Sequence, residues 1–483
     1  MSKIEKIMLA LPNDRWFGNR HWHGFPYTFG VLSSVLKDNY DVKVLDASFE
    51  NLDYGQVKKR IEEYKPDILG INCMSMEYTK HFQKLASISK EVCPETKIVV
   101  GGIYPTLLPK VLIKNKNIDY VVIGEGEFRF PNLLKALKNP NVDLSNFEGI
   151  AFNSPEGIKV NPIQNYIQDL DSLPLPFYGN INLEGYANKA NKYAYYTYPN
   201  RFPYATTITS RGCPFKCIFC SSEKINGPKI RYRSAESVLK EVDWLVEEYG
   251  MKEIIFMDDN LYLDSKRLDK ILDGLIERNY DLEWKAIAAA VYALNDSKLK
   301  KMRRSGCYQL SLAVEAGSKE GLKRLNKPTS IIDKIKPLVK TAKSLDYEIG
   351  GMFIIGTPGE TWEDIRQTIN LAEELDLDYS AFNVCTPLLK TKLYDLVKKD
   401  NLIPKDFNFD SLDFKGFGRA TITTNEFTPE EIQIVRAFEW DRINFKTQEK
   451  REKIAKMCGI NLQELNDWRV STRRGLGVKV RYK

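Results

Sequence analysis

The sequence predicts an α/β protein made of a doubly wound domain, a partial (β/α)6 barrel and a mainly helical C-terminal region. Apolar runs bounded by Gly and Pro alternate with helical patterns through most of the chain, as in parallel sheets with helical crossovers. This alternation stops over residues 141–200, where Pro, Asn and Gly are frequent. After residue 390 the pattern is mainly helical.

The first predicted domain covers residues 1–140 and has five strands. They read KIMLALP, DVKVLD, DILGINC, KIVVGG and YVVIGEG, and helical stretches separate them. Five strands in about 120 residues match one doubly wound (Rossmann-like) domain, which binds its ligand at the carboxyl ends of the strands. No G-x-G-x-x-G follows the first strand, so a dinucleotide is not the expected ligand.

The second predicted domain covers residues 201–390, after a connector at 141–200 with a small hairpin. Its strands read YATTITS, EIIFMDD, EWKAIAAA, YQLSLAVEA, IGGMFIIG and SAFNVCTP, each followed by a helical stretch. Six such units are too few for a full eight-fold barrel, which needs about 250 residues, so a partial barrel is predicted. Residues 391–483 form the predicted helical, basic C-terminal region.

Composition and charge are those of a globular protein. Hydrophobic residues make up 43% and charged residues 28% of the chain. No apolar run of about eighteen residues is present, and the start reads as a strand, so no membrane span and a cytoplasmic location are expected. The net charge of +7 arises after residue 440, where twelve Lys or Arg face five Asp or Glu. A solvated basic helix and tail is the favoured interpretation, and nucleic acid is not the expected partner.

Three cysteines lie within eight residues in SRGCPFKCIFCSSEKI, in the loop after the first barrel strand. Cys213, Cys217 and Cys220 form a cluster of thiolates, which binds soft metals. A structural zinc site closes with four ligands, and no histidine is near in the sequence. A four-iron cluster held by three thiolates fits the number better and leaves one iron open. The other cysteines are scattered and are interpreted as incidental thiols.

The spacing C-x-x-x-C-x-aromatic-C, here Cys213, Cys217, Phe219 and Cys220, resembles the signature of radical S-adenosylmethionine (SAM) enzymes. The resemblance implies a 4Fe–4S cluster whose open iron is chelated by the amino and carboxylate groups of SAM. It also implies that an electron from a donor such as flavodoxin or ferredoxin cleaves the sulfonium. The deoxyadenosyl radical that results abstracts hydrogen from an unreactive carbon.

The same resemblance implies SAM contacts at other strand ends. Asp258 and Asp259 in FMDDN fall where the family binds the methionine amine, and Glu315 falls where a ribose contact is usual. Gly356 belongs to a segment similar to the adenine strand, which departs from the pattern at Met352. The predicted SAM-binding residues are therefore Phe219, Asp258, Asp259, Glu315 and Gly356.

The first domain resembles the cobalamin-binding domain that precedes the barrel in one branch of radical SAM enzymes. Cobalamin domains commonly carry an aspartate, a histidine two residues on and a glycine three beyond. In FPYTFG these places hold Phe25, Tyr27 and Gly30, so cobalamin is expected without its own base or a protein histidine beneath the cobalt (base-off, His-off). The expected contacts are Tyr27, Gly30, Cys73, Met74, Ser75, Gly101, Gly102, Tyr104, Pro105, Gly124, Glu125 and Gly126.

Several roles stay open. Tyr27 or Trp22 either faces the lower side of the cobalt or packs against a helix. His21 and His23 are either surface residues or proton carriers that face a substrate. No catalytic residue is identified from the sequence.

The resemblance implies a cobalamin-dependent radical SAM methyltransferase that methylates an unactivated carbon of a small molecule or peptide with two SAM molecules per turnover. One alternative is cyclisation, rearrangement or oxidation with the same cofactors. The non-enzymatic alternative is a cobalamin or cluster carrier. A methylthiotransferase is discounted because the first domain has only Cys73 and Cys93 to hold a second cluster.

Overall fold

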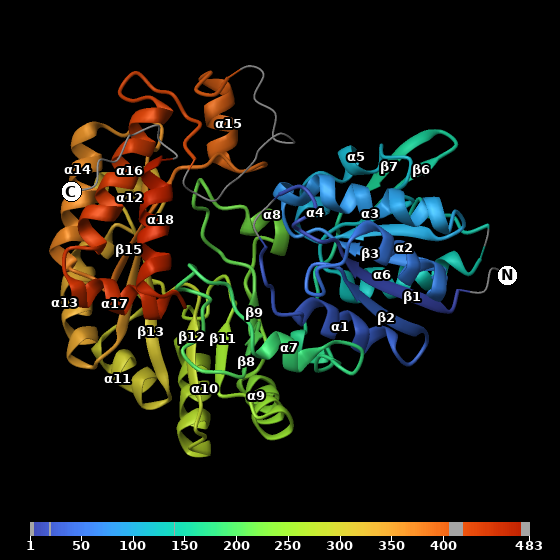
Figure 1. The fold of residues 1–483 in the computed structure, drawn as a ribbon, viewed down its shortest axis with the longest axis horizontal. Helices are drawn as coiled ribbons and strands as arrows, with labels where there is room; N and C mark the ends of the chain where they lie inside the picture. The colour runs from blue at the N-terminus through green and yellow to red at the C-terminus, as the bar shows by residue number, and fades with distance from the viewer. Residues whose placement is uncertain (1–3, 19–20, 140, 405–418, 475–483) are drawn as a thin grey trace. The chain divides into compact units, whose positions relative to one another are not determined.

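The structure, a computed structural model, describes residues 4–18, 21–139, 141–404 and 419–474. Within these ranges the chain divides into two compact units. Unit 1 comprises residues up to 189 together with 224–231, and unit 2 comprises 190–223 and most of the chain after residue 231 (Figure 1). The boundaries expected near residues 140, 200 and 390 stay predictions.

Unit 1 is built on a seven-stranded sheet of order β2-β1-β3-β4-β5-β6-β7. The five predicted strands pair in parallel, and a hairpin from the predicted connector adds β6 and β7 in antiparallel fashion. The strands are β1 (Lys6–Leu11), β2 (Asp41–Asp46), β3 (Ile68–Asn72), β4 (Lys97–Gly101), β5 (Tyr120–Val122), β6 (Ile150–Ser154) and β7 (Gly157–Asn161).

Helices cover both faces of this sheet because successive strand residues point to opposite sides. In β1, Met8 and Ala10 belong to one apolar cluster, whereas Ile7 and Leu9 belong to the other. Helices α2 to α5 pack on the first cluster, and α1 and α6 on the second. The helices are α1 (Tyr27–Leu36), α2 (Tyr54–Tyr64), η1 (Met76–Tyr78), α3 (Thr79–Val92), α4 (Ile103–Leu107), α5 (Pro109–Leu112), α6 (Gly126–Leu137), η2 (Leu170–Ser172) and α7 (Leu183–Ala187). The predicted doubly wound fold is confirmed.

The strand order of unit 1 reverses between β1 and β3. From β1 the chain moves outward to β2 and then returns to the other side of β1 to form β3. At such a switch point the loops that follow the two strands diverge, and the crevice between them is where doubly wound domains bind ligands.

Unit 2 is built on a parallel six-stranded sheet whose order, β15-β14-β13-β12-β11-β8, follows the sequence. The sheet is a partial barrel, as predicted, because its first and last strands are both edges. The strands are β8 (Tyr204–Thr207), β11 (Glu253–Phe256), β12 (Glu283–Ala286), β13 (Cys307–Glu315), β14 (Glu348–Ile355) and β15 (Tyr379–Val384), with the short β9 (Ser210–Arg211) and β10 (Arg231–Tyr232) outside it.

Helices follow the barrel strands and then form the C-terminal region, as predicted. They are α8 (Ser222–Asn226), α9 (Ala235–Tyr249), α10 (Ser265–Arg278), η3 (Val291–Ala293), α11 (Asp296–Arg304), α12 (Lys319–Arg324), α13 (Ser330–Ser344), α14 (Trp362–Leu375), α15 (Lys392–Lys399), α16 (Pro429–Asn444), α17 (Gln448–Met457) and α18 (Leu462–Arg474). Thr428 caps α16 with a reciprocal bond to Glu431.

The edge of β15 is closed by a side chain from α16. The Asn444 amide accepts a hydrogen bond from Ser380 N (2.7 Å) and donates one to Ser380 O (2.9 Å). Asn444 is fully buried. Its amide thus takes the place that the backbone of a neighbouring strand would otherwise occupy.

Basic residues after residue 440 are paired within unit 2. Arg442 and Lys446 contact Glu373, and Arg469 contacts Asp441. Residues 475–483, the end of the predicted basic tail, lie outside the described residues. Among the helices that the structure describes, none combines the length and the apolar character of a membrane span.

Candidate active site

The loop with the three cysteines follows β9 in unit 2. Its main chain is held by two other segments, since Ile218 N donates to Leu325 O (3.2 Å) and Leu393 N donates to Ile218 O (2.9 Å). Asn326 Nδ2 also donates to Lys216 O (2.6 Å). These bonds fix the loop at the carboxyl ends of the barrel strands, which is where barrel active sites lie.

The three thiols lie close enough to influence one another. Burial raises the pKa of Cys217 to about 11, and the neighbouring Cys220 and Cys213 add to the rise. The charge of Lys327 opposes it. The donor set is therefore three sulfurs with the nearly buried cation of Lys327 beside them.

Asp258 holds the turn that leads into the cysteine loop. Its carboxylate is buried and accepts hydrogen bonds from Thr209 N (3.1 Å), Thr209 Oγ1 (2.7 Å) and Ser210 Oγ (2.5 Å). Burial raises its pKa, and these bonds oppose the rise. The adjacent Asp259 is exposed and accepts from Ser222 Oγ (2.7 Å), so it is the accessible carboxylate of the predicted pair.

Asn260 and Tyr292 lie beside Cys213, and the sequence did not reveal either of them. Asn260 Nδ2 lies 2.9 Å from the Tyr292 hydroxyl and 3.9 Å from Cys213 Sγ. Asn260 Oδ1 is buried without a hydrogen-bond partner among the described residues. An orphaned buried oxygen next to a metal ligand fits a site that is completed by a bound group. In the sequence, Asn260 could have been singled out because it directly follows Asp258 and Asp259 at the end of a barrel strand.

Glu315 ends β13 in a strained conformation. Its φ is +70°, which a non-glycine residue rarely adopts, and the pairing with β14 shifts register just before it. Its carboxylate lies 2.9 Å from Lys327 Nζ, and both side chains are nearly buried. Lys327 Nζ also lies 5.9 Å from the centroid of Phe219. The pair therefore links the end of β13 to the cysteine loop.

Gly356 directly follows β14 and is covered by the C-terminal helix α16. Its φ is +82°, and a Cβ there would lie 3.1 Å from Ile432 Cγ2 of α16. The next residue, Thr357, donates its N–H to Glu360 Oε2 (2.8 Å). Burial raises the pKa of Glu360 to about 7. Gly356 thus permits close approach of α16 as well as a left-handed turn.

The donors in unit 2 fit a cluster better than a single ion. Among the described residues no three His, Cys, Asp or Glu side chains converge to hold one metal ion. A four-iron cluster does not require such convergence, because each of its cysteines binds a different iron.

The strand ends of unit 1 form an open cradle at β3 and β4. Gly102 has φ +109°, and a Cβ there would lie 2.6 Å from Asn72 Oδ1 and 2.7 Å from Cys73 O. A Cβ on Gly101 would meet no atom closer than 3.9 Å. Next to these glycines, the apolar side chains of Met74 and Ile103 are 41% and 42% exposed. Backbone and apolar side chains are thus both accessible at this edge.

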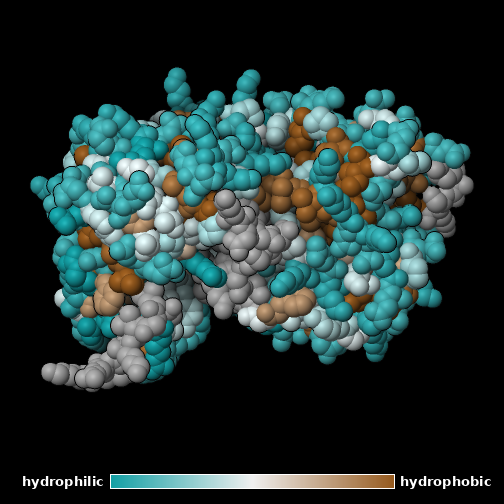
Figure 2. Space-filling model, turned by 90° about the horizontal axis from the view of Figure 1, so that it is seen from above, coloured by the Kyte–Doolittle hydropathy of each residue, from teal (hydrophilic) through white to brown (hydrophobic). Residues whose placement is uncertain are grey.

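Some hydrophobic residues are visible at the surface. The face drawn in Figure 2 is mostly hydrophilic, with hydrophobic atoms concentrated to the right of its middle.

Three other predicted cobalamin contacts pack or form an ion pair with residues of unit 1. A Cβ on Gly30 would meet Tyr178 at 2.6 Å, so Gly30 permits packing of α1 on a distant segment. Tyr104 is 1% exposed and packs near Phe82. Glu125 forms a buried ion pair with Arg231 at 2.7 Å.

The remaining predicted contacts lie around the same strand ends. The thiol of Cys73 is buried, Ser75 Oγ accepts a hydrogen bond from Glu77 N (3.4 Å), and Gly124 N donates to Thr106 Oγ1 (2.8 Å). Pro105 lies in α4, whereas Tyr27 and Gly126 begin α1 and α6.

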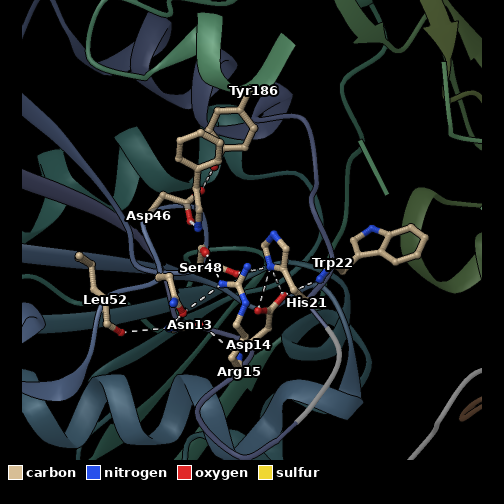
Figure 3. Close-up of polar contacts among 11 residues, drawn as sticks. Asn13, Asp14, Arg15, His21, Trp22, Asp46, Ser48, Leu52 and Tyr186 are labelled. Atoms are coloured by element: carbon tan, nitrogen blue, oxygen red, sulfur yellow. Dashed lines mark hydrogen bonds and ion pairs between the residues drawn. The ribbon is translucent and has the colours of Figure 1, made fainter. Parts of the chain in front are cut away.

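The loop after β1 carries a polar network (Figure 3). His21 Nδ1 lies 3.1 Å from each carboxylate oxygen of Asp14, and Trp22 N donates to Asp14 Oδ2 (2.7 Å). The Tyr186 hydroxyl bonds to Asp46, whose pKa burial raises to about 6. Asp14 gave no signal in the sequence, because it does not occupy the place of the aspartate in the cobalamin motif.

Two family models match the chain. The Radical SAM superfamily model matches residues 207–372, and the B12 binding domain model matches residues 23–134. The first range contains the cysteine loop and five barrel strand ends, and the second contains the cradle of unit 1. A radical SAM domain uses a 4Fe–4S cluster and SAM, and a B12 binding domain binds cobalamin. The two matched family models thus confirm the three predicted cofactors, the 4Fe–4S cluster, SAM and cobalamin.

Curated relatives extend over most of the chain. An uncharacterized methyltransferase of Pyrococcus horikoshii is 33% identical over 407 residues, which are 83% of this chain and 85% of the relative. Cytidylyl-2-hydroxyethylphosphonate methyltransferase of Streptomyces wedmorensis is 29% identical over 81% of each chain. Anaerobic magnesium-protoporphyrin IX monomethyl ester cyclase of Rubrivivax gelatinosus is 30% identical over 75% of this chain and 64% of its own.

Solved structures share the fold. OxsB, a cobalamin-dependent SAM radical enzyme solved with aqua-cobalamin bound, matches with a TM-score of 0.74 at 18% identity, over 98% of this chain and 72% of its own. The methyltransferase TsrM from Kitasatospora setae matches with a TM-score of 0.69 at 14% identity, over 98% of this chain and 99% of its own. With the two family models and the Pyrococcus relative, these matches show that the chain belongs to the radical SAM enzymes that carry an N-terminal B12 binding domain.

Proposed function

We propose that the protein methylates an unactivated carbon of a small molecule or peptide and consumes two SAM molecules per turnover. The observation that carries this proposal is the pairing, in one chain, of a B12 binding domain with a radical SAM domain that contains a three-cysteine loop. Three cysteines would leave one iron of a four-iron cluster open to SAM. Two of the relatives described above are named as methyltransferases, which supports the same activity.

In unit 2, each predicted residue takes a role that follows from its surroundings. Cys213, Cys217 and Cys220 would hold the cluster. Asp259, which is exposed, would receive the methionine amine of SAM, while Asp258 positions the loop through Thr209 and Ser210. Glu315 would receive the ribose hydroxyls, and Phe219 and the Gly356 turn would line the SAM site.

In unit 1, the cradle at Gly101, Gly102 and Met74 would receive cobalamin. Bound cobalamin supplies a nucleophilic metal centre that can accept and release a methyl group. Tyr27 stands where a histidine would be needed to ligate the cobalt from below, so we propose the base-off, His-off form.

The overall reaction balances with an external reductant. One SAM loses its methyl group and becomes S-adenosylhomocysteine. The other accepts an electron and yields methionine and, after taking the substrate hydrogen, 5′-deoxyadenosine. Restoring the starting state requires two electrons per turnover, so an electron donor such as flavodoxin or ferredoxin is part of the proposal. A cytoplasmic location, where such donors are found, is proposed with it.

Product analysis tests this function. The protein would be reconstituted anaerobically with iron, sulfide and hydroxocobalamin, and then given SAM with a deuterated methyl group and a reductant. We expect S-adenosylhomocysteine and deoxyadenosine together, and a deuterated methyl group on an extracted cellular metabolite or peptide. Deoxyadenosine without S-adenosylhomocysteine would contradict methylation. It would favour cyclisation, rearrangement or oxidation, the second candidate, which the cyclase relative supports. Cofactor binding without either product would indicate a carrier.

Lys327→Met is expected to weaken SAM binding about tenfold and to shift the cluster midpoint potential to more negative values. The change leaves the nearly buried Glu315 carboxylate without its cation, so this carboxylate loses its position. Reduction adds negative charge to the cluster, which a nearby cation stabilises. Redox titration followed by EPR and equilibrium dialysis of SAM would measure the two effects.

The matched control is Lys323→Met. Lys323 pairs with Glu320 on the surface, with both side chains more than 60% exposed. An exposed pair of this kind contributes little, so neither measurement should change. Equal potentials in Lys327→Met and the wild type would show that Lys327 has no electrostatic influence on the cluster.

A further inference from the structure

Trp22 is placed differently from the other tryptophans. It is half-buried in the loop after β1, and its indole has neither a ring partner nor a hydrogen bond from Nε1 among the described residues. Figure 3 shows that the indole extends away from the polar network of the loop. A ring partner is found for each of Trp16, Trp244, Trp284, Trp362, Trp440 and Trp468. Because neither the ring nor Nε1 is engaged by another described residue, this indole is available to a ligand.

The backbone of Trp22 is fixed by Asp14. Trp22 N donates to Asp14 Oδ2 (2.7 Å), and the same carboxylate binds His21 Nδ1 at 3.1 Å. Ser48 Oγ lies 3.2 Å from His21 Nδ1. Burial alone would raise the pKa of Asp14, but the bonds from His21 and Trp22 outweigh this effect, so the pKa lies below its usual value. These bonds hold the backbone of Trp22 in place without a ligand, which reduces the entropy lost on binding.

The network is anchored to the rest of unit 1. Arg15 Nη1 donates to Ser48 O (2.9 Å), and Asn13 Nδ2 donates to Leu52 O (3.0 Å) (Figure 3). These bonds tie the loop after β1 to the segment after β2. Because its neighbours Asn13 and Arg15 are held in this way, Asp14 has a fixed position from which it binds the backbone of Trp22.

Trp22 lines a pocket at the switch point of the sheet. The pocket is also lined by Leu11 from the end of β1, Asn72 from the end of β3, and Met74 and Tyr78 beyond it. Met74 is among the predicted cobalamin contacts and is 41% exposed. The indole thus stands at the place where a doubly wound domain binds its ligand, beside an exposed apolar side chain.

Unlike the indole of Trp22, both histidine rings of this loop are already engaged by other residues of unit 1. His23 is buried, its ring stacks on Tyr186 at 4.9 Å, and its Nε2 lies 3.3 Å from Tyr186 O. Burial lowers the pKa of His23 to about 4, so the ring is neutral. His21 is turned toward Asp14 by the contact at Nδ1.

We infer that Trp22 is the side chain against which the lower face of the corrin ring packs, and that Asp14 is its positioning residue. The inference rests on the proposed function, because it requires bound cobalamin. A flat apolar indole offers a large contact area and no lone pair for the cobalt. It thus gives a physical reason for binding without a protein nitrogen, which the absence of the motif histidine alone does not supply.

Cobalamin affinity and the EPR spectrum of the bound cob(II)alamin test the inference together. Trp22→Ala should weaken binding of hydroxocobalamin by tenfold or more, on the order of the loss of one large aromatic contact. The matched control is Phe17→Ala, which removes a 44% exposed aromatic of the same loop and should not change the affinity. Trp22→His should introduce nitrogen hyperfine splitting that is absent from the wild type, and ¹⁵N-histidine labelling should alter it. Asp14→Asn should weaken binding without introducing nitrogen splitting.

Two results would overturn the inference. One is equal cobalamin affinity in Trp22→Ala and the wild type. The other is nitrogen splitting in the wild type that His21→Gln removes, since His21 would then occupy the lower face. Failure of the wild type to bind cobalamin at all would contradict the proposed function itself and, with it, this inference. Circular dichroism of each variant separates loss of the contact from loss of the fold.

Discussion

Cys217→Ala is expected to abolish both iron binding and SAM cleavage. The wild type should hold about four iron atoms per chain after reconstitution, whereas the variant keeps only two of the three thiolates that attach the cluster. The loop itself should stay folded, because its main chain is held by Leu325 and Leu393 and not by the thiols. Iron analysis, the absorption spectrum and deoxyadenosine formation measure the effect.

Cys93→Ala is the matched control for this experiment. Cys93 is a half-buried thiol of unit 1, so its loss should leave iron content and SAM cleavage unchanged. Cys213→Ala and Cys220→Ala should behave like Cys217→Ala. Iron content and deoxyadenosine formation at wild-type levels in any of the three would show that the cluster is attached elsewhere.

Arg231→Met is expected to destabilise unit 1 by about 3–5 kcal/mol, because it leaves the buried Glu125 carboxylate without its cation. Arg231 Nη1 lies 2.7 Å from Glu125 Oε1 and 2.6 Å from Ile167 O, and its guanidinium lies 5.1 Å from the centroid of Tyr166. Both charged side chains are about 95% buried. Urea unfolding followed by circular dichroism, with the transition of unit 1 resolved, gives the free energy.

Two further variants identify the source of this loss. In the double variant Glu125→Gln with Arg231→Met, much of the stability should return, because no buried charge remains unpaired. Arg366→Met, which breaks an exposed pair with Glu363, should change the free energy of unfolding by less than about 1 kcal/mol. A loss of similar size in the exposed and buried variants would contradict the role of burial.

The strands and the cysteine loop could be predicted from the sequence because both depend on local patterns. Most predicted strands are short apolar runs, which a parallel strand buried on both faces requires, whereas the edge strand DVKVLD alternates between apolar and charged residues. The cysteines are identified by spacing alone. The radical SAM assignment followed from the cysteine stretch and the cobalamin assignment from the spacing of motifs in the first domain, and the two matched models confirm them.

The partners of the site residues could not be predicted, because they come from distant parts of the chain. Glu125 meets Arg231 across 106 positions, and Asp258 meets Thr209 across 49. The spacing of Gly30 matches the cobalamin motif, yet its lack of a side chain serves packing against Pro176 and Tyr178. Such pairings depend on the tertiary fold, which a single sequence without its relatives does not reveal.

The amide of Asn444 has a consequence for the behaviour of the protein in solution. A partial barrel has unpaired edges, and an unpaired edge invites a strand from another molecule to add to the sheet. On β15 the backbone of Ser380 is already engaged by a side chain of the same chain. Sheet growth from this edge would have to displace that side chain first, so the open architecture is protected there against self-assembly into larger β-structures.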